Sequence, residues 1–252
     1  MDLGIRDRVA LITGASAGIG RATALALASE CARVAITYHE NERAAQDVCL
    51  RMRAAGCDPL VLRYDVTDPE GIRSTVEAVL DRWGSLDILI ANAHHSATVI
   101  DPRTPFEHVS EDTWTPTLSG VLEGPFRTVQ AVVPVMRRQR WGRIVLVSCA
   151  SAETGVVGAA AFGTAKAGLH GLARSLAREL GPCGVLTNVV VPGMTLTERI
   201  AHLPEPVRQA QCAQTLTKRL STPEEVAAGI LFLASSACGN VNGETLHVTG
   251  GL

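Results

Sequence analysis

Three glycines near the start of the chain have the spacing of a phosphate-binding turn. Gly14, Gly18 and Gly20 follow an apolar run and open a segment rich in alanine and leucine. Glycine at these positions permits a tight turn, close approach of the backbone to a pyrophosphate, and close packing of the following helix. The free N–H groups and the dipole of that helix would face the anion. The stretch predicts a dinucleotide phosphate site; a turn that only starts a helix is the alternative.

A second set of residues has the chemistry for proton transfer or nucleophilic attack. His94 and His95 follow an apolar run, at an edge where open α/β sheets bind ligands. A histidine titrates near neutrality and can serve as acid or base, although many loop histidines only bond to the backbone. Cys149 could form a thiolate or be a small core residue. Lys166, one of two lysines beside 21 arginines, indicates a site that needs a compact ammonium; a surface cation is the alternative.

The hydrophobic pattern supplies the elements that would position these groups. Short β-branched runs alternate with longer Ala/Leu/Arg segments, and the runs are apolar on both faces, as in parallel strands covered on each side. Helix starts are indicated by Asp68 with Pro69, and by a capping box of Thr222 and Glu225 around Pro223. The pattern predicts a single-domain, Rossmann-like doubly wound parallel sheet with helices on both faces. The expected strands are 8–13, 33–38, 60–64, 86–92, 143–148, 185–191 and 245–248.

The composition narrows the class of protein further. The 252 residues are 46% hydrophobic, enough for a large core in one domain spanning residues 1–252. A net charge of −2 without basic runs argues against a nucleic-acid partner. No apolar stretch reaches the roughly 18–20 residues that span a bilayer, and the N-terminus lacks a signal-peptide pattern. Seven scattered cysteines without a CxxC pair indicate neither disulfides nor zinc. We therefore expect a cytoplasmic protein without a membrane partner or a metal.

Taken in order, the motifs resemble those of the short-chain dehydrogenase/reductase family, and specifically its bacterial 3-oxoacyl-carrier-protein reductases. The resemblance covers nearly the whole chain: TGASAGIG at 13–20, YDV at 64–66, ANA at 91–93, VVVPGMTLT at 189–197, and the C-terminal PEEVAAGILFLAS and NGETLHVTGGL. It implies a nicotinamide-dinucleotide site formed by Gly14, Ser16, Gly18, Ile19, Gly20, Thr37, Tyr38, Asp65, Val66, Asn92, Ala93, Lys166, Pro192, Gly193 and Thr195.

The resemblance also implies a role for several individual residues of that site. The residues themselves leave a second interpretation open in each case. Asp65 would contact the adenine, or it is only a turn or capping carboxylate. Asn92 would belong to the site, or it is an amide that ties neighbouring strands, and the two roles can coexist. Thr37 and Tyr38 stand where an acid usually selects NAD(H). Ala17 stands where relatives that use NADP(H) often carry arginine. We expect NADP(H) rather than NAD(H).

At the catalytic positions the chain departs from the family. The family reduces a carbonyl with hydride from the nicotinamide and a proton from a tyrosine, whose pKa a lysine lowers; a serine and an asparagine assist. Registered on Lys166, the tyrosine position is Phe162, the serine position is Cys149 and the asparagine position is Val121. His94 replaces a glycine of the family. The chain's two tyrosines lie towards the adenosine end, so neither can replace the missing phenol.

Three functions fit this pattern. The first is an NADP(H)-dependent reductase of a keto group, with His94, Cys149 or water as proton source. The second is a non-redox enzyme, such as a dehydratase or cyclase. The third is a non-catalytic subunit of a heteromeric reductase. We favour the first, because an intact nucleotide site is combined with titratable groups at the ligand edge.

The resemblance further implies a small-molecule or carrier-bound, polyketide-like ketone as substrate. Residues 194–218 have the length and proline content of a substrate lid, with apolar residues spaced for an amphipathic covering helix. The C-terminal segments match those with which the family commonly forms oligomers. We therefore expect a homo-oligomer, either a dimer or a tetramer, with a hetero-oligomer containing an active homologue as the alternative.

Overall fold

The computed structural model describes residues 2–97 and 103–252, and a parallel sheet lies at its centre. The sheet has seven strands in the order β3-β2-β1-β4-β5-β6-β7. Every strand predicted from the apolar runs is confirmed, with small shifts at the ends. The order reverses between β1 and β4, which creates the switch point where ligands bind in such sheets. The strands are β1 (Val9–Ile12), β2 (Arg33–Tyr38), β3 (Leu60–Arg63), β4 (Ile88–Ala91), β5 (Gly142–Val147), β6 (Val185–Pro192) and β7 (Thr245–Val248).

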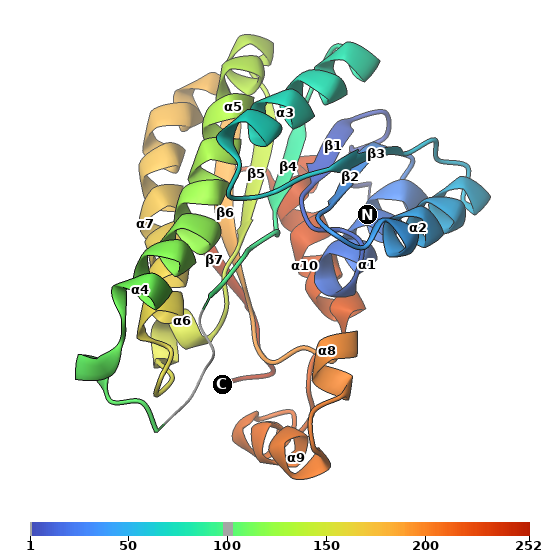
Figure 1. Ribbon diagram of the computed structural model, residues 1–252. Coiled ribbons are helices and arrows are strands. Elements are labelled where there is room, and N and C mark those ends of the chain that lie inside the picture. Colours follow the sequence, from blue (N-terminus) through green and yellow to red (C-terminus); the bar gives the residue numbers. More distant parts are fainter. Residues whose placement is uncertain (1, 98–102) are drawn as a thin grey trace.

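Helices cover both faces of the sheet, as Figure 1 shows. Successive side chains of a strand point to opposite faces. Along β1, Ala10 and Ile12 belong to one core, and Val9 and Leu11 belong to the other. This explains why the strands are mostly apolar on both faces. The first core is covered by α1 (Gly18–Ser29), α2 (Glu42–Ala54) and α10 (Pro223–Ala234), and the second by α3 (Pro69–Trp83), α5 (Gly124–Gln139) and α7 (Ala160–Leu180).

The two predicted helix starts are confirmed. The Asp68 carboxylate accepts a hydrogen bond from the Glu70 amide at 3.0 Å, at the start of α3. At the start of α10, the Thr222 hydroxyl accepts from the Glu225 amide at 3.3 Å, while the Glu225 carboxylate accepts from the Thr222 amide at 2.9 Å. Because α10 packs against α1, this capping box helps to fix the helix that follows the glycine turn.

Two shorter helices lie beyond the carboxyl ends of the strands. Residues 194–218, the predicted lid, contain α8 (Glu198–Ala201) and α9 (Glu205–Gln214), which project away from the sheet in Figure 1. The remaining helical segments are Phe106–His108, α4 (Glu111–Leu118), a π-helical turn at Ser119–Glu123, α6 (Ser151–Thr154), Gly181–Cys183 and Ser236–Cys238. Within the described ranges, no helix combines the length and apolar character needed to cross a bilayer.

Candidate functional site

A cleft of about 1340 Å³ opens at the carboxyl edge of the sheet. Pockets for single small ligands measure roughly 300–1,000 Å³, so the cleft has room for a dinucleotide and a second ligand. Every residue predicted for the nucleotide site lines it, and so do His94, His95, Cys149 and Phe162. Val121 does not. The folding of distant segments thus brings together nearly all residues that the sequence singled out.

Two glycines of the glycine turn have backbone angles that residues with a side chain rarely adopt. Gly14 and Gly18 have φ angles of +68° and +53°, in the region that L side chains rarely adopt. A Cβ atom at Gly20 would lie 2.3 Å from the carbonyl oxygen of Gly14. The Gly14 amide donates to the Thr37 hydroxyl at 3.0 Å, which ties the turn to β2. Ala17, before α1, provides no side-chain cap, so the first amides of α1 are left for another acceptor.

An acidic side chain from the lid segment supplies that acceptor. The Gly18 amide donates to a carboxylate oxygen of Glu198 at 3.3 Å, and the other oxygen of Glu198 pairs with Arg21 at 2.5 Å. Burial acts to raise the pKa of Glu198, but backbone hydrogen bonds and Arg21 outweigh it and the pKa is lowered. An anion therefore already lies at the N-terminus of α1. The 180-residue separation of Glu198 from Gly18 leaves no local sequence signal for this contact.

Asn92 joins the ends of two central strands. Its side-chain amide donates to the carbonyls of Thr13 and Gly14 at 3.0 and 2.9 Å. The Thr13 hydroxyl accepts from the backbone amides of Asn92 and Ala93 at 3.1 and 3.0 Å. The strand-tying role considered for Asn92 is thus present, and the same residue lines the cleft. Asn92 holds the glycine turn against β4.

The end of the cleft at which the sequence predicts the adenosine contains Asp65 in a turn. Its carboxylate accepts from the amide and hydroxyl of Thr67 at 2.8 and 2.7 Å and lies 3.4 Å from His39. The hydroxyl of Thr67 is the largest cause of the lowered pKa of Asp65. The Tyr64 hydroxyl is buried 2.6 Å from that of Thr128, and burial raises the pKa of Tyr64 to about 12. Tyr64 is therefore held as a neutral phenol away from the catalytic end.

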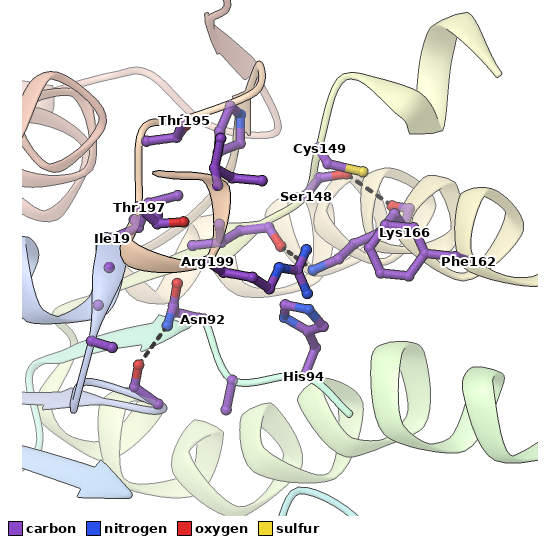
Figure 2. Close-up of a pocket in the computed structure, with 18 of the residues that line it drawn as sticks. Ile19, Asn92, His94, Ser148, Cys149, Phe162, Lys166, Thr195, Thr197 and Arg199 are labelled. Atoms are coloured by element: carbon purple, nitrogen blue, oxygen red, sulfur yellow. Dashed lines mark hydrogen bonds between the residues drawn. The ribbon is translucent and has the colours of Figure 1, made fainter. Parts of the chain in front are cut away.

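Lys166 occupies the opposite end of the cleft and is buried. Its ammonium donates to the Val147 carbonyl at 2.8 Å, and burial lowers its pKa to about 8. The ammonium lies 5.9 Å from the ring centre of Phe162. The Phe162 ring in turn lies 5.9 Å from the ring of His94. Figure 2 shows these three side chains grouped at one end of the cleft.

His94 is accessible from the open cleft, yet it is surrounded by protein atoms. The charge of Lys166, followed by burial, lowers the pKa of His94 to about 3. His94 is therefore a neutral imidazole at neutral pH. In that form it donates or accepts a hydrogen bond, but it does not carry an extra proton to give away.

The other two substituted positions differ in exposure. The Cys149 thiol is half-buried, lines the cleft and lies 2.8 Å from the Ser151 hydroxyl. Val121 is fully buried in the π-helical turn between α4 and α5. Such turns are frequent at functional sites, but the Val121 side chain has no polar atom for a relay water. The π-helical turn is therefore present, but Val121 offers no side-chain amide in it.

Behind Lys166 lies a polar network that sequence reasoning missed. The Ser148 hydroxyl donates to the Lys166 carbonyl at 3.1 Å and lies 2.9 Å from His170. His170 and His247 flank Glu153, at 3.7 and 2.7 Å. In the sequence these two histidines show no ligand spacing. They lie on α7 and β7, so only the fold brings them together. No cluster able to hold a metal occurs among the residues that the structure describes.

The fold and the cleft define a class: doubly wound α/β proteins with a glycine turn opening into a cleft at the carboxyl edge. A family model described as enoyl-(acyl carrier protein) reductase matches residues 14–252. The 3-oxoacyl-(acyl-carrier-protein) reductase FabG of Escherichia coli is 36% identical over 250 residues, 99% of both chains. That of Staphylococcus aureus is 33% identical over 96% of this chain and 97% of its own. The chain belongs to the short-chain dehydrogenase/reductase family of oxidoreductases.

Solved structures agree with this assignment. A candidate short-chain alcohol dehydrogenase from Sinorhizobium meliloti 1021 is 28% identical and superposes with a TM-score of 0.91, covering 99% of this chain and 98% of that one. The predicted Rossmann-like fold is thereby confirmed.

Proposed function

We propose that the protein is an NADP(H)-dependent reductase of a keto group that works without the usual tyrosine acid. The observation that carries this proposal is the cleft itself. It is lined by every residue predicted for the nucleotide site, and the buried Lys166 ammonium lies at its catalytic end. Burial of a cation costs several kcal/mol in lost hydration unless a ligand or partner compensates. The retained burial of Lys166 therefore supports a site that still binds a ligand.

The described residues fit a dinucleotide. The turn at Gly14, Gly18 and Gly20 has no room for added side chains at its closest approach, and the amides of α1 would receive the diphosphate. The ribose hydroxyls would accept hydrogen bonds from Lys166, whose ammonium has donors beyond the one used by Val147. When bound, the nicotinamide supplies the hydride. NADP(H) is favoured because Thr37 and Tyr38, and not an acid, stand at the end of β2.

Reduction of a ketone also requires a proton at the carbonyl oxygen, and Phe162 cannot give one. With its pKa lowered to about 8, Lys166 is mostly protonated at neutral pH and titrates close to it. These are the properties of an effective general acid. Neutral His94 is suited to hydrogen-bond the carbonyl oxygen. We therefore assign proton donation to Lys166 and substrate orientation to His94.

The experiment is a coenzyme titration followed by a turnover assay. Binding of NADPH and of NADH to the protein is first measured by fluorescence titration. Turnover is then followed as the loss of NADPH absorbance with a β-keto thioester of N-acetylcysteamine. This thioester is a surrogate for the carrier-bound substrates in the names of the relatives. We expect NADPH to bind more tightly than NADH and slow turnover that Lys166→Met removes. Absence of binding by both coenzymes would reject the proposal. Tight binding without turnover for any ketone would favour the non-catalytic subunit.

A further inference from the structure

An arginine that sequence reasoning did not single out extends into the catalytic end of the cleft. Arg199 lies on α8 and lines the cleft. Figure 2 shows its guanidinium directed towards Lys166 and His94. Its charge contributes to the lowered pKa of His94. No ion pair or hydrogen bond involves the Arg199 side chain within residues 2–97 and 103–252, whereas most arginines of the neighbouring elements have a carboxylate partner.

The balance of charges at this end of the cleft is unusual. Three acidic side chains line the cleft: Glu40, Asp65 and Glu198. Each is engaged away from Lys166, since Glu40 lies beside His39, Asp65 accepts from its own turn and Glu198 pairs with Arg21. The catalytic end therefore has two cationic side chains, Lys166 and Arg199, without an acidic side chain among the described lining residues to pair with them. A cleft with this arrangement attracts an anion.

We propose that Arg199 binds a carboxylate of the substrate, so that the substrates are keto acids with a free carboxylate. This proposal rests on the proposed reductase function. A guanidinium presents a planar pair of donors that matches a carboxylate, and such charged pairs are among the stronger hydrogen bonds. The preceding residue, Glu198, is fixed at α1, so α8 is held where Arg199 faces the catalytic end. The N-terminus of α1, which would receive the coenzyme diphosphate, is contacted by the neighbouring Glu198.

The test compares matched ligands that differ only in charge. Levulinate and methyl levulinate, and acetoacetate and methyl acetoacetate, are titrated by saturation-transfer NMR into the protein with and without NADPH. We expect the acids to bind about 10-fold or more tightly than their esters. Arg199→Gln should remove this preference and leave ester binding unchanged, while Arg199→Lys retains part of it. The matched control is Arg137→Gln, because Arg137 lies on α5 and pairs with Glu179 outside the site.

The possible results distinguish the assignment of Arg199 from the proposed reductase function on which it rests. Equal affinity for acids and esters, or preference for the N-acetylcysteamine thioester, would overturn the assignment of Arg199. An equal loss of NADPH affinity in Arg199→Gln, measured without ketone, would assign the guanidinium to the coenzyme and would also overturn it. Charge-dependent binding of the acids in coenzyme-free protein supports it even if turnover is absent. Failure of the proposed function would instead show as no coenzyme binding.

Discussion

At the scale of single residues, the proposed reductase differs from the tyrosine mechanism implied by the resemblance in the group that donates the proton. Phe162 places an uncharged ring beside His94 and Lys166, with its centre 5.9 Å from the His94 ring centre and from the Lys166 ammonium. The ammonium, shielded from water, keeps a lowered pKa, and its charge keeps His94 neutral. A phenol at this position would restore the group that a lysine normally activates.

Restoring that group should accelerate ketone reduction. In Phe162→Tyr the hydroxyl would stand beside the Lys166 ammonium, which lowers the pKa of a phenol from its ordinary value of about 10. We expect the turnover number to rise about 100-fold, the lower range for a positioned general acid. The measurement is NADPH oxidation with one ketone for both proteins. Phe162→Leu is the control and should show no gain; an equal gain in both variants would assign the effect to cavity shape.

The buried ammonium should also make stability depend on pH. Lys166 titrates at about 8 in the folded chain and at 10.5 in the unfolded chain. Between these values the unfolded chain binds the extra proton, so the free energy of unfolding rises with pH across this window. We expect a rise of roughly 3 kcal/mol relative to Lys166→Met. Urea unfolding of both proteins from pH 8 to 10.5 measures it, and parallel curves for the two would contradict a lowered pKa.

At the scale of elements, α8 has a role at both ends of the cleft. Glu198 occupies the N-terminus of α1, where a coenzyme diphosphate would compete with it for the Gly18 amide. Glu198→Gln removes the negative charge but keeps the shape of the side chain. We expect this variant to bind NADPH several-fold more tightly, since a neutral amide is held less strongly by Arg21 and the helix dipole. Fluorescence titration measures the affinity.

The control for that experiment is Glu205→Gln on α9, because Glu205 also pairs with an arginine but does not line the cleft. Its affinity for NADPH should equal that of the unaltered chain. A weaker affinity in Glu198→Gln would show that Glu198 supports the coenzyme site and does not compete with the diphosphate.

Elements with local signals could be predicted from the sequence, and contacts between distant elements could not. The strands, the glycine turn and the caps at Asp68 and Thr222 depend on neighbouring residues, so their patterns are visible in the chain. The approach of Glu198 to α1 and of His247 to Glu153 depends on the path of the backbone over long separations. For Asn92 the sequence leaves both interpretations open, because one side-chain amide can tie two strands and also line a cleft.

At the scale of the whole molecule, the oligomeric state stays a prediction. The surface carries exposed large apolar side chains, including Phe126 on α5, Phe106 in the short helical segment Phe106–His108 and Val157 in a loop. Exposed apolar side chains in a contiguous patch mark association surfaces. We expect the purified chain to form a homodimer or homotetramer, measured by light scattering coupled to gel filtration. A monomer that assembles only with a tyrosine-bearing homologue would favour the heteromeric subunit.

The position of α8 has a consequence for how the two ligands affect each other's affinity. Glu198 and Arg199 are adjacent on a helix of four residues, so displacement of the first by a diphosphate shifts the second. The two binding events then share a coupling free energy, and thermodynamic reciprocity requires each ligand to change the affinity of the other by the same factor. A keto acid should therefore alter the dissociation constant of NADPH by the same factor as NADPH alters that of the keto acid, which titration of each ligand with and without the other measures.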